Sequence, residues 1–140
     1  MLNPDYSLKI SYARNAQYMQ VLTNNSLSYT SLETWFPVTP TVKPIKADVF
    51  SIGWFQQLGN NYNFSVEGYY KLIQNQIDFA DHALMLNNPY IEGEIREGKA
   101  RAYGVELAMQ AVWDKITANI SYTYSRAKRT IHDVNNGKEY

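Results

Sequence analysis

Residues 99–129 read KARAYGVELAMQAVWDKITANISYTYSRAKR, and the alternation within this stretch decides the fold. Apolar side chains occupy every second position on both sides of Trp113-Asp114, which is the period of a β-strand with one apolar face. Because so few residues separate the two arms, residues 99–112 and 115–127 are predicted to pair as an antiparallel hairpin. The apolar positions are Tyr103, Val105, Leu107, Met109 and Ala111, then Ile116, Ala118, Ile120, Tyr122 and Tyr124.

The length of these two arms indicates what kind of sheet they build. Strands in soluble domains usually run for about 5 or 6 residues, whereas a tilted strand that crosses a bilayer needs about 9–11. Both arms reach the longer figure, and the face opposite the apolar one is small and uncharged apart from Glu106. We therefore expect one face to meet lipid and the other a water-filled lumen.

The bulk composition excludes several classes of function. Thirteen basic residues balance thirteen acidic ones across the 140 residues, so neither nucleic acid nor an anionic surface is an expected partner. The sequence contains no cysteine, which excludes disulfides, thiolate chemistry and cysteine-ligated metals. No apolar run approaches about 18 residues, so no transmembrane helix is predicted. The opening MLNPDYSLKISY does not resemble a signal peptide, and we expect an exported protein to carry that signal upstream.

Three more segments of the chain repeat the alternation. Residues 6–18, 46–58 and 62–77 are predicted strands, and Gly59-Asn60-Asn61 forms a short turn between the last two because Gly and Asn tolerate positive φ. Their apolar positions are Leu8, Ile10, Tyr12, Phe50, Ile52, Trp54, Tyr62, Phe64, Val66, Tyr70 and Leu72.

Long loops are predicted at residues 19–45, 78–98 and 128–140, where Pro, Asn and Gly interrupt any period. The connections then alternate between long and short, as in an up-and-down barrel with all its short turns at one rim. The predicted fold class is all-β, an incomplete transmembrane antiparallel up-and-down β-barrel of about five long strands from a larger barrel.

Aromatic residues are expected to form two belts at the membrane interfaces. The belt near the short turns comprises Trp54, Tyr62, Phe64 and Trp113. The belt toward the long loops comprises Tyr12, Phe50, Tyr70, Tyr103, Tyr122 and Tyr124.

No catalytic, cofactor or metal site is predicted, and the chain is not expected to be an enzyme. His82 and His132 are the two histidines, both in predicted loops and without metal-ligand spacing, so we expect solvated side chains. Acidic residues around His82 either hold Ca²⁺, contact a cargo or keep the loop solvated. They are Asp78, Asp81, Glu92, Glu94 and Glu97. The sequence has no GxSxG elbow, phosphate-binding Gly loop or basic-aromatic platform.

Two other classes of protein share some of these features. A soluble antiparallel β-sheet binding module also alternates, but its strands should be shorter and its exposed face richer in Lys and Glu. An outer-membrane barrel hydrolase would need a Ser and a His on adjacent strands at the same height, whereas both histidines fall in predicted loops.

With the strands placed, the chain resembles a known family. The run GKARAYGVELAMQAVWDKITANISYTYSRAK resembles a barrel segment of TonB-dependent outer-membrane receptors, in which a Tyr-Gly-Val-Glu-Leu strand leads by a short turn into a strand ending Tyr-Thr-Tyr-Ser. KISYARNAQY, KPIKADVFSIGWFQQL and SVEGYYKLIQNQID resemble other strands of that family, in the same order. Many iron-chelate receptors have Pro-Glu where this chain has Pro44-Ile45, and the pattern is more similar to receptors of Bacteroidetes-type bacteria.

The resemblance implies a location in the bacterial outer membrane and a role in active transport. Family barrels have about 22 strands around a plugged lumen, so these strands are expected to be a fragment of one. The parent would bind a scarce ligand and import it when a TonB complex pulls on the plug. Its implied partners are outer-membrane lipid, the unidentified ligand and TonB, with no cofactor. Residues 19–45 and 78–98 are the expected cargo contacts, and the plug and TonB box are expected to lie outside this chain.

Overall fold

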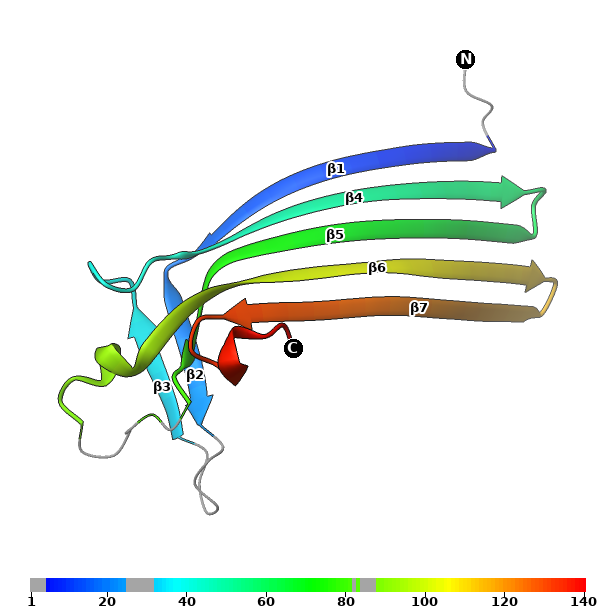
Figure 1. The fold of residues 1–140 in the computed structure, drawn as a ribbon. Coiled ribbons are helices and arrows are strands. Elements are labelled where there is room, and N and C mark those ends of the chain that lie inside the picture. Colours follow the sequence, from blue (N-terminus) through cyan, green and yellow to red (C-terminus); the bar gives the residue numbers. More distant parts are fainter. Residues whose placement is uncertain (1–4, 25–31, 82, 84–87) are drawn as a thin grey trace. The chain divides into compact units, whose positions relative to one another are not determined.

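The computed structural model of the protein describes residues 5–24, 32–81, 83 and 88–140. Five strands form one sheet in the order β1-β4-β5-β6-β7, and two more strands, β2 and β3, form a separate small sheet (Figure 1). The large sheet comprises β1 (Tyr6–Gln17), β4 (Ile45–Leu58), β5 (Tyr62–Phe79), β6 (Ile95–Trp113) and β7 (Ile116–Ile131). The small sheet comprises β2 (Met19–Asn24) and β3 (Leu32–Pro37), and the two short 3-10 helices are η1 (Ile91–Glu94) and η2 (Asn135–Gly137).

Neighbouring strands of the large sheet run in opposite directions, and short turns join β4 to β5 and β6 to β7 (Figure 1). In the order of the described strands, β1 and β7 are the two ends, so this sheet is open. The predicted class, an all-β incomplete antiparallel up-and-down barrel, is confirmed. None of the helices in the described ranges has the length and hydropathy required to span a bilayer.

The strands on the long-loop side extend beyond the predicted limits. β5 continues to Phe79, β6 already begins at Ile95 and β7 continues to Ile131, so the predicted loops 78–98 and 128–140 are shorter than expected. Charged residues among these additions, Asp78, Arg96, Glu97, Lys128 and Arg129, interrupt the apolar period, although Phe79, Ile95 and Ile131 are apolar.

The prediction that residues 19–45 form a loop was wrong, because β2 and β3 pair there as an antiparallel hairpin. Val21 lies opposite Trp35 and Gln20 opposite Phe36. The period of two is present but short, and a buried polar residue, Gln20, stands where the pattern calls for an apolar one. Because of this polar residue and the prolines that follow, the sequence pattern did not reveal these two strands.

The chain divides into two compact units. The first, here called the strand unit, contains Met1–Ala13, Asp48–Lys71 and Ala102–Ala127, and therefore both short turns. The second, here called the loop unit, contains Arg14–Ala47, Leu72–Arg101 and Lys128–Tyr140.

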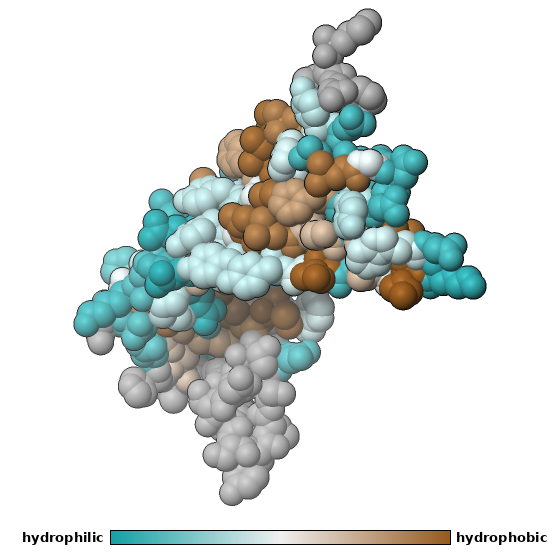
Figure 2. Space-filling view, turned by 90° about the vertical axis from the view of Figure 1, so that its right-hand side faces the viewer, coloured by the Kyte–Doolittle hydropathy of each residue, from teal (hydrophilic) through white to brown (hydrophobic). Residues whose placement is uncertain are grey.

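In the strand unit, one face of the sheet is apolar and uncovered. Ile10 is 75% exposed, Ile52 52% and Ile120 70%, although all three belong to regular strands. In Figure 2, apolar residues (brown) and residues of intermediate hydropathy (pale) lie beside one another on the surface. Large apolar side chains are normally buried in soluble domains. Their exposure here indicates that this face contacts an apolar environment rather than water.

The opposite face of the strand unit is polar. The Ser11 and Ser51 hydroxyls lie 2.6 Å apart across β1 and β4, and the Asn63 amide donates a hydrogen bond to Gln110 Oε1 at 3.3 Å. The side chains on this face are mostly neutral, as the sequence predicts for a wall that meets a hydrated lumen.

Aromatic rings on the apolar face pair across neighbouring strands. Near the short turns the Trp54 and Phe64 centroids are 5.8 Å apart and those of Tyr62 and Trp113 5.9 Å, both edge to face. Farther from the turns the Tyr12 and Phe50 centroids are 4.8 Å apart, and the Tyr70 and Tyr103 rings stack at 6.4 Å. Each pair joins members of one predicted belt, and such pairs each contribute about 0.5–1.5 kcal/mol beyond area burial.

Candidate functional site

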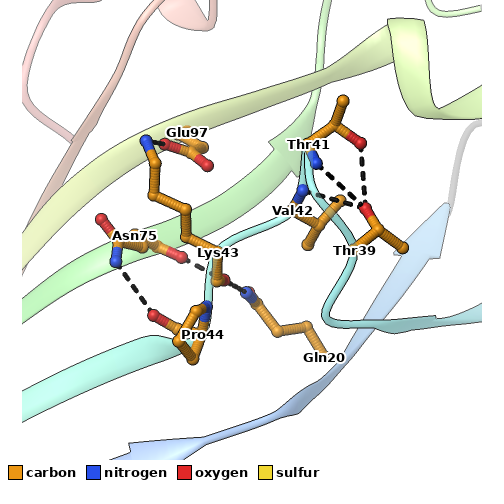
Figure 3. A network of polar contacts seen from close by, with 8 residues as sticks. All are labelled: Gln20, Thr39, Thr41, Val42, Lys43, Pro44, Asn75 and Glu97. Carbon is orange, nitrogen blue, oxygen red and sulfur yellow. Dashed lines mark hydrogen bonds and ion pairs between the residues drawn. The ribbon is translucent and has the colours of Figure 1, made fainter.

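A buried side-chain amide, that of Gln20, helps to anchor the β2–β3 hairpin in the loop unit. Gln20 is 3% exposed, and its Nε2 donates to the carbonyl oxygens of Lys43 at 3.2 Å and Asn75 at 3.3 Å (Figure 3). Its Oε1 accepts the backbone N–H of Ile77 at 3.3 Å. Because both ends of the amide are satisfied by backbone groups of other segments, Gln20 fixes where the hairpin lies on β5.

Asn75 of β5 contacts both Gln20 and the segment that leads into β4. Its φ of 58° lies in the left-handed region, which Asn tolerates better than most residues. The Asn75 Nδ2 donates to the Pro44 carbonyl at 2.9 Å, while its own carbonyl accepts from Gln20 (Figure 3). One residue of β5 thus holds both the hairpin and the start of β4.

The segment between β3 and β4 is shaped by a threonine turn. The Thr39 hydroxyl accepts the backbone N–H groups of Thr41 at 3.3 Å and Val42 at 3.1 Å (Figure 3). The Thr41 hydroxyl donates to Glu92 Oε2 at 2.6 Å, and the Lys43 ammonium lies 3.0 Å from Glu97 Oε2. Side chains of residues 38–44 therefore tie this segment to η1 and β6.

The inner face of the hairpin packs on a small apolar core. This core consists of Leu22, Phe36, Val42 and Ile77, with Phe79, Ile91 and Ile95 packed against it. The Phe36 and Phe79 rings meet edge to face with centroids 6.0 Å apart. The core contains residues of β2, β3, β5 and β6 in the loop unit. It therefore fixes the hairpin against the other strands of that unit.

The outer face of the hairpin carries apolar side chains that the rest of the loop unit leaves exposed. Trp35 is 62% exposed, and Val21, its partner across the hairpin, and Met19 are also exposed. A Trp ring held on a rigid hairpin offers a large flat contact at little entropic cost. We take this outer face, defined by Met19, Val21 and Trp35, as the candidate ligand-contacting surface.

The structure separates the acidic residues that the sequence groups around His82, and His82 itself lies outside the described residues. Asp78 pairs with Arg129 at 3.2 Å, and Asp81 accepts the backbone N–H of Asn135 at 3.0 Å. Glu92 and Glu97 bind Thr41 and Lys43 instead. No group of three or more His, Asp or Glu in the described ranges is arranged to hold a metal ion. These carboxylates act as ties between segments of the loop unit.

The last residues of the chain fold back onto β7 and are held there by charge. The Tyr140 and Arg129 backbones exchange hydrogen bonds of 2.9 and 3.1 Å, and the Arg129 guanidinium lies 4.5 Å from the centroid of the Tyr140 ring. Glu139 bridges the Lys128 ammonium and the Arg101 guanidinium. The hydrogen bonds from Lys128 and Arg101 lower the pKa of the Glu139 carboxyl below its ordinary value. A depressed carboxyl pKa stabilises the folded form above the ordinary value and loses that contribution as the pH falls through the lowered one.

His132 lies in the same segment and pairs with the residue that follows it. Its Nδ1 is 3.1 Å from Asp133 Oδ1, and its side chain is 87% exposed. Asp133 also lies 3.2 Å from Arg96 Nε, and hydrogen bonds from His132 and then Arg96 lower the pKa of Asp133. The pair contributes to the polar surface of the loop unit.

Comparison with protein families agrees with this architecture. The family model described as TonB dependent receptor-like, beta-barrel, matches the chain over residues 1–140. No solved structure matches the chain.

Proposed function

Because the chain belongs to the TonB dependent receptor-like β-barrel family, we propose that it supplies wall strands and ligand-contacting loops to an outer-membrane receptor. The family is one of outer-membrane transporters rather than enzymes. In this proposal the receptor binds a scarce ligand from outside the cell and imports it with energy that TonB transmits from the inner membrane.

The observation that carries the proposal is the uncovered apolar face of the strand unit. Exposing apolar surface to water costs about 25 cal/mol per Å², and Ile10, Ile52 and Ile120 each leave more than half of their surface exposed. Contact with hydrocarbon removes that cost, whereas a soluble binding module would have covered these residues. The apolar face therefore favours a wall that lies against lipid.

The polar face supports the transport part of the proposal. A depression of about 640 Å³ opens on the strand unit, with Ser7, Gln57, Asn63, Gln110 and Ser121 among the residues around it. The lining also includes Asp5 and apolar residues such as Phe55, and its hydroxyls and amides can hydrate a passage. We assign this depression to the lumen-facing wall.

Ligand contact is assigned to the outer face of the β2–β3 hairpin. The hairpin is held by Gln20 and by the apolar core, so Trp35 is presented on a support that does not need to be ordered when a ligand arrives. A single exposed aromatic residue that becomes buried on binding is often worth about 2 kcal/mol or more.

Uptake in cells that make the complete receptor tests this function. Media from cells with and without the receptor are compared by mass spectrometry to find solutes whose depletion depends on it. We expect at least one such solute, no depletion when TonB is disrupted, and depletion about thirtyfold slower with Trp35→Ala. Trp35→Phe keeps an aromatic ring and serves as the matched control, with receptor levels equalised. Depletion that is insensitive to TonB would contradict transport, and normal uptake by Trp35→Ala would contradict the assigned contact.

A further inference from the structure

The apolar face of the strand unit contains a groove that the proposed function does not explain. It has a volume of about 620 Å³ and is lined almost entirely by apolar atoms. Its floor includes the backbone at Gly68 and Gly104. Its sides include Ile10, Phe50, Ile52, Tyr103, Val105 and Tyr124.

The groove exists because Gly68 has no side chain at a position where its neighbours carry large ones. A Cβ at Gly68 would lie 3.9 Å from Ile52 Cγ2 and 3.9 Å from the Gly104 carbonyl oxygen, which is ordinary contact. At Gly104, by contrast, a Cβ would lie 2.7 Å from Tyr69 Cε1 and 2.8 Å from the Tyr124 carbonyl oxygen. Packing therefore requires glycine at position 104 but not at position 68, where its effect is to leave the groove open.

Aromatic rings give the groove firm sides. Tyr70 and Tyr103 stack with an interplanar angle of 18°, and Phe50 packs against Tyr12. These contacts hold rings against one another at two sides of the groove. A polar molecule placed there would give up its hydration without gaining hydrogen-bond partners along the apolar lining.

We propose that this groove binds one acyl chain of an outer-membrane lipid. The inference rests on the proposed function, which places the apolar face against the bilayer. Lipid chains then already surround the groove, and a flexible hydrocarbon chain can fill an apolar depression that opens on a lipid-facing surface. Each methylene that enters contributes a transfer free energy of the kind that drives lipid anchoring.

The test fills the groove with a side chain. Gly68→Leu places an isobutyl group in the depression at a site where a Cβ fits, and Ala118→Leu adds the same group to the apolar face outside the groove lining. The complete receptor is stripped of lipid in detergent, mixed with a dipalmitoyl phosphatidylethanolamine, and its bound lipids are counted by native mass spectrometry. We expect Gly68→Leu to reduce retention of one lipid about tenfold or more, since several methylenes lose their contacts, and Ala118→Leu to match the unsubstituted receptor.

Each other outcome counts against the groove assignment. Equal retention in all three proteins would overturn it, and equal loss in both variants would show a general surface effect instead. If Gly68→Leu abolished a concentration-dependent dimer and left lipid retention unchanged, the groove would bind a second copy of the chain. Heat-modifiable migration in gels verifies that each variant is folded. A receptor that inserts into vesicles but shows no selective lipid loss refutes this inference alone, whereas failure to insert refutes the proposed function.

Discussion

Replacing Ile120 with arginine is expected to destabilise the folded receptor in a bilayer by about 2–4 kcal/mol, the range for a basic residue at the lipid-facing midplane of a barrel. Ile120 is 70% exposed on the apolar face of β7, and along this strand it lies between Ile116 and Tyr124. A guanidinium there would have to enter hydrocarbon without a partner. Urea unfolding in phospholipid vesicles, followed by the fraction of heat-modifiable protein, measures the loss.

The neighbouring residue provides the matched control. Ser121 lines the depression on the polar face, so Ser121→Arg adds the same group one position along β7 but directs it toward water. We expect a change within about 0.5 kcal/mol, as for most surface substitutions. Equal destabilisation by the two variants would contradict the assignment of the two faces.

Truncating Phe36 to alanine is expected to cost about 3–5 kcal/mol in the packing of the loop unit. Phe36 is 5% exposed in the apolar core and meets the Phe79 ring edge to face. Its loss leaves a cavity beneath the β2–β3 hairpin that Leu22 and Val42 can fill only in part. Hydrogen exchange at the amides of β2 and β3 should therefore become faster by at least a hundredfold, since 1.4 kcal/mol corresponds to a factor of about ten.

Trp35→Ala tests whether this effect comes from the core. Trp35 is the next residue on β3 but lies on the outer face of the hairpin, so its removal takes away a larger ring without opening a cavity. We expect hydrogen exchange in β2 and β3 to stay within about threefold of the unsubstituted protein. If Trp35→Ala accelerated exchange as much as Phe36→Ala, the assigned inner and outer faces of the hairpin would be wrong.

The large sheet was predictable because its signal is local. In residues 99–129 the apolar period of two persists over both arms, and the turn between them is short, so pairing and register follow from the sequence itself. The four aromatic pairs lie across other neighbours, β1 with β4, β4 with β5 and β5 with β6, and each joins two members of one predicted belt. Tyr62 and Trp113, for example, were both placed near the short turns, whereas the alignment of β5 with β6 that brings them into contact is seen only in the structure.

The β2–β3 hairpin was not predictable in the same way, because its signal depends on tertiary contacts. Gln20 occupies a buried position only because the carbonyls of Lys43 and Asn75 and the N–H of Ile77 are there to bind it. When those partners are not known, a glutamine at a position where the alternation requires an apolar residue favours the prediction of a loop. The alternation of Met19, Val21 and Trp35 on one face was the remaining local sign of strands.

The acidic residues of the loop unit illustrate a second limit. Asp78 and Asp81 are close in sequence to Glu92 and Glu97, which suggested one cluster, but their partners lie far along the chain. Asp78 binds Arg129, and Asp81 binds the backbone of Asn135. Proximity in sequence does not predict which group each carboxylate binds, because the fold brings different cations and donors to each of them.

The central claim is that alternate residues of these strands face two solvents, and a cysteine scan along β7 tests it most directly. Residues 1–140 contain no cysteine, and single cysteines at positions 117–123 are introduced one at a time in the complete receptor in vesicles, with the unsubstituted receptor as the labelling background. We expect positions 118, 120 and 122 to resist a membrane-impermeant thiol reagent and, once labelled with a fluorophore, to be quenched by lipids with brominated acyl chains. Positions 117, 119, 121 and 123 should react with the aqueous reagent and escape quenching. Uniform reactivity along the strand, or the opposite alternation, would contradict the claim.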